Sequence, residues 1–259
     1  MENHRFYLST ISADAADTAR RYGLGLEIAE YCTAYNMDGH FPETDAAVRE
    51  KLAGIARATL HAPFNELFPC AIDPKARELA GLRYRQAIRT AQAYGISTLV
   101  LHAGFNPHLY FPCWFTEQSV LFWQDFVQEI PDGMTVCLEN VLEETPELLT
   151  DILQTVGSPK LRLCLDVGHI NTYSSVAAEQ WLEVCAPYTV HFHIHNNDGS
   201  RDAHDALFAG QLDMKQLLYS AERLCPNAPF TLELPAAEPS VRWLTENGIL
   251  EEKEESPWF

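Results

Sequence analysis

Short apolar runs alternate with longer amphipathic segments along most of the chain. Short runs of this kind are typical of buried β-strands, and the amphipathic segments between them are typical of helices that cover a sheet. The pattern predicts strands within residues 5–11, 25–32, 58–64, 97–105, 134–141, 161–169, 188–196 and 230–235.

The amphipathic segments carry recognisable helix boundaries. The segment "DAADTARRYG" opens with an acidic residue and ends at Gly23. The segment "DPKARELAGLRYRQAIRTAQAYG" places Pro74 in the first helical turn and Gly95 just past the end, which is the usual order of these two residues around a helix. In "TPELLTDILQTVG" we expect Thr145 to be the N-cap and Gly157 to end the helix.

Eight β-α units in a chain of this length predict an α/β fold, namely a single-domain (β/α)8 TIM barrel over residues 1–250. The alternative is an open, doubly wound parallel sheet. It is disfavoured because no G-x-G-x-x-G or Walker sequence follows any predicted strand. The charged tail 251–259, "EEKEESPWF", lacks periodicity, and we expect it to fray.

Histidine or carboxylate side chains follow or end six consecutive predicted strands. In chain order they are His61, His102, Glu139, Asp166 with His169, His193 and His195 with Asp202 and His204, and Glu233. The carboxyl ends of barrel strands share one rim, where active sites of TIM barrels lie. Taken singly, each residue has an ordinary structural explanation, such as a hydrogen-bonded histidine or a helix cap.

Taken together, the strand-end residues predict a metal site. Burying several carboxylates in one cavity is costly unless cations offset their charge. Imidazole and carboxylate ligands without thiolate suit Zn²⁺, Mn²⁺, Fe²⁺ or Co²⁺. We therefore expect divalent metal ions as cofactors.

Charge and cysteine usage narrow the class of protein. The net charge of −18 repels phosphate backbones and anionic membrane surfaces, so nucleic acid and membranes are poor partners. The seven cysteines are scattered without a CxxC pair, and we expect buried free thiols rather than disulfides or a structural zinc site. No apolar run is long enough for a membrane span or a signal peptide, so we expect a cytoplasmic protein.

The strand-end motifs resemble those of a known superfamily. "HAPF", "LHAG", "LEN", "LDVGH", "HFHIHNND", "DAHDALFAG" and "LELP" are similar to motifs of the xylose isomerase-like TIM barrels. That group includes class II apurinic endonucleases of the endonuclease IV type as well as sugar isomerases and epimerases. The resemblance extends from the third predicted strand to the eighth.

The resemblance implies one of two metal arrangements. The epimerase arrangement holds one ion with Glu139, Asp166, His193 and Glu233. The endonuclease arrangement holds three ions: one at His61, His102 and Glu139; one at Glu139, Asp166, His193 and Glu233; and one at His169, Asp202 and His204. Glu139 would bridge the first two. His195 is then interpreted as a substrate contact or a partner that orients a ligand, and His191 as a structural core histidine.

The complete set of nine ligands favours hydrolysis over isomerisation. Clustered ions can activate a water and stabilise the leaving oxygen of a phosphoester, whereas an isomerase needs one ion and two carboxylates that move protons. We therefore expect a metal-dependent phosphoesterase, foremost a phosphodiesterase, with Glu139, Glu233 and Asp166 as catalytic residues. A single-metal sugar or sugar-phosphate isomerase or epimerase is the alternative, and a non-catalytic metal or ligand sensor is a third hypothesis.

The predicted rim loops indicate a small-molecule substrate. The loop after the fourth strand is aromatic, and Phe105, Tyr110 and Trp114 are expected to line the mouth and contact the substrate by stacking. Arg201 is the one basic residue that the sequence places clearly at this rim. DNA-binding enzymes need several phosphate contacts from Lys or Arg, so this composition argues against DNA as the substrate.

Overall fold

Eight parallel strands close into a barrel in the computed structural model, which describes residues 1–251. The strands are β1 Phe6–Ser9, β2 Gly25–Ile28, β3 Ala58–His61, β4 Thr98–His102, β5 Thr135–Glu139, β6 Leu161–Asp166, β7 Thr189–Ile194 and β8 Phe230–Leu232. Each strand pairs with its sequence neighbour, and β1 pairs with β8. The predicted single-domain (β/α)8 barrel is confirmed. Of the expected tail 251–259, all but Glu251 lies outside the described residues.

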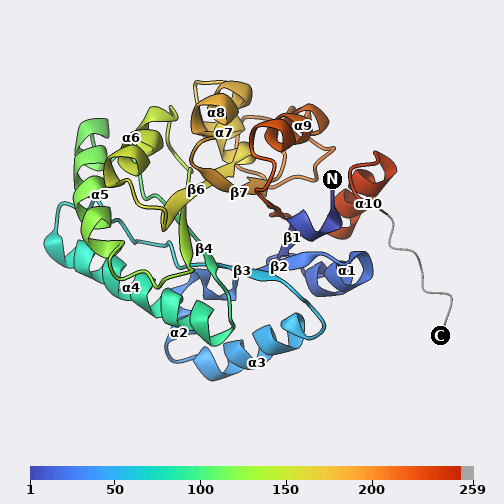
Figure 1. The fold of residues 1–259 in the computed structure, drawn as a ribbon, viewed down its shortest axis with the longest axis horizontal. Coiled ribbons are helices and arrows are strands. Elements are labelled where there is room, and N and C mark those ends of the chain that lie inside the picture. Colours follow the sequence, from blue (N-terminus) through green and yellow to red (C-terminus); the bar gives the residue numbers. More distant parts are fainter. Residues whose placement is uncertain (252–259) are drawn as a thin grey trace.

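Helices surround the strands, as Figure 1 shows. The α-helices are α1 Ala15–Tyr22, α2 Ala34–Met37, α3 Phe41–Leu52, α4 Pro74–Ala93, α5 Pro112–Phe126, α6 Glu147–Val156, α7 Val167–Tyr173, α8 Ala178–Cys185, α9 Met214–Leu224 and α10 Glu238–Glu246. Two short 3-10 helices, η1 Asn3–Arg5 and η2 Glu30–Cys32, precede β1 and follow β2. None of the helices within residues 1–251 combines the length and the apolar composition needed to cross a membrane.

The expected helix boundaries hold with one exception. Helix α1 ends at Gly23 and α6 at Gly157, both in the left-handed conformation that favours glycine. Helix α4 begins at Pro74. The N-cap prediction for Thr145 is wrong: Pro146 occupies the N-cap position of α6, so Thr145 lies one residue too early to cap it.

The two faces of the barrel wall differ in chemistry. Successive side chains of a strand point to opposite faces, so alternate residues face the helices or the barrel interior. The outward residues form the main hydrophobic core with the helices; they include Leu8, Leu26, Leu60, Leu101, Leu138, Leu165, Ile194 and Leu232. The inward residues are mostly polar: Glu27, Thr59, His61, His102, Glu139, Asp166, His191, His193 and Thr231, with a small apolar cluster of Val100, Cys137 and Cys164.

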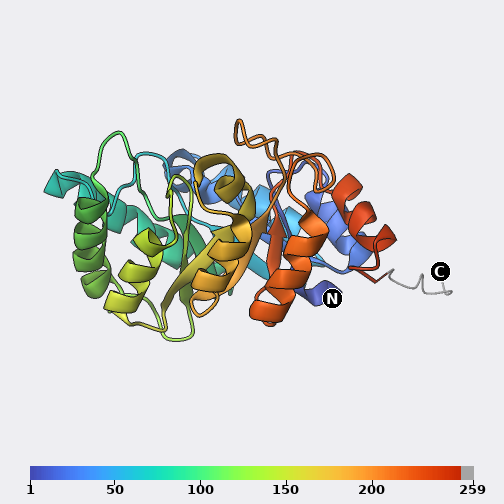
Figure 2. The same cartoon turned by 90° about the horizontal axis from the view of Figure 1, so that it is seen from above.

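Strand register brings the polar ends together. His102 lies beside Glu139 on the neighbouring strand, and Asp166 lies beside His193. The loop that follows β7, drawn in orange in Figure 2, extends beyond one end of the strands and carries Asp202 and His204. The cysteines are free, and Cys137 and Cys164 are buried as predicted, whereas Cys113 is exposed.

Candidate metal centre

Glu139, at the end of β5, lies at the middle of the candidate site. Its Oε2 is 3.2 Å from Nε2 of His61 and 3.6 Å from Nε2 of His102. Its Oε1 is 3.2 Å from Nδ1 of His193 and 3.4 Å from Nδ1 of His169. The two oxygens of this fully buried carboxylate therefore face different sets of histidines, which is the arrangement that a bridging ligand requires.

Four residues form a central group around Glu139. Ligand atoms of Glu139, Asp166, His193 and Glu233 all lie within 4.8 Å of one another, and all four residues are buried. The second group is less compact. His61 joins Glu139 and His193 at the same mutual spacing, whereas His102 reaches this group through its 3.6 Å contact with Glu139.

A third group gathers around Asp202, in the loop after β7. Oδ2 of Asp202 lies 3.2 Å from Nε2 of His169 and 3.3 Å from Nε2 of His204. His195 belongs to the same set of mutually close ligand atoms. The structure thus brings together all nine residues that the resemblance implied, in three adjoining groups.

His195 lies among the ligands. It is fully buried, its Nε2 is 3.1 Å from Oδ1 of Asp166 and 3.6 Å from Oδ1 of Asp202, and its ring stacks on that of His204 at 3.9 Å. A Cβ at Gly168 would lie 2.0 Å from the His195 ring, so the glycine makes room for it. Direct contact with substrate does not fit a fully buried ring; orientation of ligands or ligation does.

Three histidines are anchored through one nitrogen and present the other to a carboxylate. Nδ1 of His61 lies 2.9 Å from the Ala62 carbonyl, that of His169 2.8 Å from the Asn140 carbonyl, and that of His204 2.8 Å from the Glu233 carbonyl. In each case Nδ1–H can donate to the carbonyl and leave the Nε2 lone pair free. Hydrogen bonds of this kind fix the orientation of metal-ligating histidines.

Buried polar atoms at the site lack partners of their own. Within residues 1–251, Oε1 of Glu139, Oδ2 of Asp166, Oδ1 of Asp202, Nδ1 of His193 and both ring nitrogens of His195 are buried without a hydrogen bond. Orphaned buried donors and acceptors of this kind are costly. Divalent cations would satisfy them, and the mixed imidazole and carboxylate set suits Zn²⁺ and similar ions. The residues therefore fit the metal centre that the fold family implies.

The ionisation of the site follows from its crowding. Burial lowers the pKa of His102 to about 3, so its ring is neutral and ready to ligate. Burial also opposes the charged form of His61, but the hydrogen bond to Glu139 and the charge of that carboxylate outweigh it and raise the pKa of His61 to about 9. For His204 burial is likewise outweighed, mainly by Asp202, and its pKa rises to about 9. Protons on these rings occupy the place that a cation would take.

Two buried glutamates were missed from the sequence. Glu27 on β2 faces the interior, where its Oε1 lies 2.8 Å from Nε2 of His193. A glutamate between Leu26 and Ile28 in an apolar run was the available signal. Glu143, in the loop after β5, is buried, its Oε2 accepts from the Val141 amide at 2.6 Å, and burial raises its pKa to about 7.

The aromatic residues expected at the mouth have mixed positions. The expectation for Phe105 is wrong: its side chain is buried in the hydrophobic core and packs on Phe115 at 5.0 Å. Packing of the apolar Phe105 ring against α5 is more favourable than leaving it exposed at the mouth of the barrel. Trp114 donates from Nε1 to the Cys70 carbonyl at 2.8 Å and so ties α5 to the loop after β3. Tyr110 is half-buried and remains a candidate, as does the exposed Arg201.

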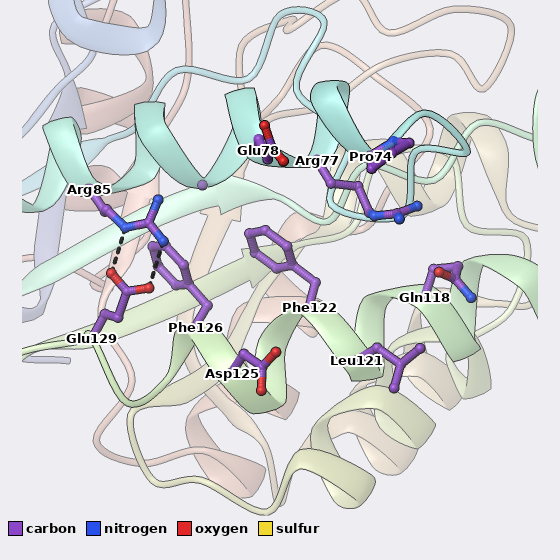
Figure 3. Close-up of a pocket in the computed structure, with 11 residues that line it drawn as sticks. Pro74, Arg77, Glu78, Arg85, Gln118, Leu121, Phe122, Asp125, Phe126 and Glu129 are labelled. Atoms are coloured by element: carbon purple, nitrogen blue, oxygen red, sulfur yellow. Dashed lines mark hydrogen bonds and ion pairs between the residues drawn. The ribbon is translucent and has the colours of Figure 1, made fainter.

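A separate groove lies outside the barrel, between α4 and α5. Figure 3 shows Arg85 paired with Glu129 there, with Phe122 and Phe126 pointing into the groove. None of the candidate ligands lines it. Arg85 and Glu129 are exposed and pair with each other, and among the described residues the groove gathers no cluster of buried histidines and carboxylates.

Comparison with known proteins identifies the family. The family described as "Xylose isomerase-like TIM barrel" matches residues 13–253. The chain belongs to this family. A probable endonuclease 4 from Ureaplasma parvum serovar 3 is 26% identical over 201 residues, which cover 68% of this chain and 64% of that protein. The chain thus spans less than two thirds of that relative, as it does of an uncharacterised Methanocaldococcus jannaschii protein, of which it covers 63%.

Several solved structures share the fold of this chain. A D-tagatose 3-epimerase-like protein superposes with a TM-score of 0.77 at 19% identity, over 94% of this chain and 96% of that one. The TTHB071 protein from Thermus thermophilus, in a structure obtained by soaking with ZnCl2, gives 0.76 at 22% identity, over 98% and 100%. The names of the similar proteins include both an epimerase-like protein and a probable endonuclease.

Proposed function

We propose that this protein is a metal-dependent phosphoesterase with a multinuclear centre, foremost a phosphodiesterase. The main support is that the two carboxylate oxygens of Glu139 face different histidines: Oε2 faces His61 and His102, while Oε1 faces His193. A site for one ion has no need of imidazoles on both sides of one carboxylate. The third group around Asp202 supports the same proposal.

Each residue has a role that follows from its contacts. Glu139 bridges the first two groups; Asp166, His193 and Glu233 complete the central one; and His169, Asp202 and His204 form the third. When bound, clustered divalent ions supply a nucleophilic water near neutral pH and offset charge on phosphoester oxygens. Backbone carbonyls hold His61, His169 and His204 in place, so little rearrangement is needed when substrate arrives.

The substrate that we propose is a small molecule rather than DNA. The net charge of −18 opposes a polyanion, and Arg201 is exposed and free to meet one phosphate group. Tyr110 and Trp114, both partly buried in the loop and helix after β4, are the aromatic candidates for contact with an organic group.

The test is hydrolysis of an aryl phosphodiester by protein purified without chelator. We expect two or three transition-metal ions per chain and a loss of more than about 100-fold in activity for Glu139→Gln, because removing a ligand costs more than removing its supporting hydrogen bond. Glu129→Gln, in the outer groove of Figure 3, is the matched control and should retain full activity. One ion per chain, or equal activity in both variants, would refute the multinuclear proposal.

A sugar or sugar-phosphate epimerase or isomerase is the second candidate. The central group of Glu139, Asp166, His193 and Glu233 can by itself hold one ion such as Mn²⁺ and offers two glutamates for proton transfer. Similarity to a D-tagatose 3-epimerase-like protein supports it. Deuterium uptake from D₂O into a ketose, with one ion per chain, would favour this candidate over hydrolysis.

A further inference from the structure

A second polar layer lies beneath the candidate ligands, inside the barrel. Its centre is Glu27, fully buried on β2, whose Oε1 lies 2.8 Å from Nε2 of His193. Its Oε2 accepts from Thr59 at 2.8 Å and from Thr231 at 3.2 Å, and lies 3.3 Å from Nε2 of His191. The carboxylate is thus held from three strands, and its free oxygen is directed at His193.

We propose that Glu27 is the positioning residue for His193. A carboxylate 2.8 Å from Nε2 favours a proton on that nitrogen, which leaves Nδ1 as the ring nitrogen available to a metal ion. Nδ1 in turn faces Oε1 of Glu139 at 3.2 Å and Oε1 of Glu233 at 3.6 Å. Glu27 therefore orients His193 toward the central group without touching that group's other ligands.

Strand geometry explains why a carboxylate has this role at His193. The carbonyls that anchor His61, His169 and His204 belong to Ala62, Asn140 and Glu233, residues that follow β3, β5 and β8. His193 lies within β7, where the neighbouring carbonyls are engaged in the sheet. The nearest acceptor from across the barrel is the Glu27 carboxylate, whose Oε1 lies 2.8 Å from Nε2 of His193.

The inference rests on an ion in the central group, which the proposed function also requires, but it does not rest on hydrolysis. The experiment is a titration of metal-free protein with Co²⁺, followed by visible absorption. Glu27→Gln, which keeps the shape and removes the charge, should weaken one site by about 10- to 100-fold. The site at Asp202 should keep its affinity. Cys137→Ser, inside the same barrel wall, is the matched control and should bind as wild type does.

A double-mutant cycle separates positioning from a general effect on folding. If Glu27 acts through His193, Glu27→Gln should cost little further Co²⁺ affinity in a His193→Asn background. Additive losses, or an unchanged Co²⁺ affinity in Glu27→Gln alone, would overturn the inference. If Glu27→Gln does not fold, Glu27→Asp replaces it in the double-mutant cycle with His193→Asn. The shorter side chain keeps the charge but moves it away from Nε2 of His193. Additive losses, or an unchanged Co²⁺ affinity in Glu27→Asp alone, would again overturn the inference. Wild-type protein that binds no Co²⁺ would refute both this inference and the proposed function.

Discussion

The two faces of the barrel wall are made by alternate residues of the same strands, yet they have different roles. Along β3, Leu60 faces the helices and joins the hydrophobic core, while Thr59 and His61 face the interior and meet Glu27 and Glu139. TIM barrels commonly fill the interior with branched apolar side chains. In this barrel the outward face carries most apolar packing, and the inward face carries the candidate chemistry.

The contrast shows how a barrel can tolerate a charged interior. Carboxylates and imidazoles are interleaved, so that buried charges have opposite neighbours; Glu27 with His193 and Glu139 with His61 are examples. Burial raises the pKa of a carboxyl, but the charge of His193 and the hydrogen bonds from His193 and His61 outweigh it and hold the pKa of Glu139 well below its usual range. Breaking one pair should therefore cost function, whereas trimming the outer face should cost stability.

A truncation on the outer face of the barrel wall should have the largest effect on the free energy of unfolding. Leu60→Ala removes a fully buried side chain and should lower the free energy of unfolding by about 2–5 kcal/mol. Metal content per folded chain should not change, because the inward neighbours keep their partners. Chemical denaturation and elemental analysis measure the two quantities; a parallel loss of bound metal would contradict the separation of the faces.

A smaller loss of stability is expected at Gly168 of helix α7, which faces the His195 ring. Gly168→Ala would place a Cβ 2.0 Å from the His195 ring, and overpacking of this kind costs about 1–3 kcal/mol. Displacement of His195 should also weaken metal binding at the Asp202 group, which a Co²⁺ titration would detect. Gly39→Ala, with no atom within 4 Å of the new Cβ, is the control and should be neutral in both measurements.

On the inner face, metal binding should also depend on pH. His61 and His204, with pKa values raised to about 9, carry protons at pH 7 in metal-free protein, and an ion must displace them. Apparent metal affinity should thus rise with pH, by up to about tenfold per unit for each proton released, and level off above about pH 9. Calorimetry in buffers of different ionisation enthalpy would count the protons released when metal binds. If no proton is released, the ion does not displace the protons of His61 and His204.

The same two histidines set an opposite and weaker trend in metal-free protein. Their pKa values are higher in the folded than in the unfolded state, so their contribution to stability is complete below the ordinary histidine pKa of 6.5 and is lost as pH rises through about 9. Metal-free protein should therefore unfold at a lower denaturant concentration above about pH 9 than at about pH 6. Equal midpoints at the two pH values would show that these histidines are not paired with carboxylates in solution.

Much of the site was predictable because barrel topology converts strand order into proximity. His61, His102, Glu139, Asp166 and Glu233 each end or follow a strand, and a closed parallel barrel brings those ends to one rim. Glu27 was overlooked because it sits within an apolar run rather than at its end. Its role depends on β2 facing β7 across the barrel interior. The spacing of residues along the sequence does not indicate this contact.

Other outcomes depended on packing that local sequence does not describe. Phe105 and Tyr110 occupy the same aromatic loop, yet only Phe105 is buried in the core, because α5 offers Phe115 as a partner. His195 belongs to the ligand groups because Gly168, on another element, leaves space for its ring.

The eight strands, the barrel and the histidines and carboxylates at six strand ends could be predicted from the order of amino acids, since hydrophobic periodicity and strand order require no knowledge of distance. The choice of nine ligands among them is what the resemblance to the family implies. Only the folded chain reveals which nitrogen of each histidine is anchored, how the two oxygens of Glu139 are divided, and that Glu27 lies 2.8 Å from His193. These details escape the sequence because hydrogen bonding and charge pairing act over a few ångströms between strands that are far apart in the chain.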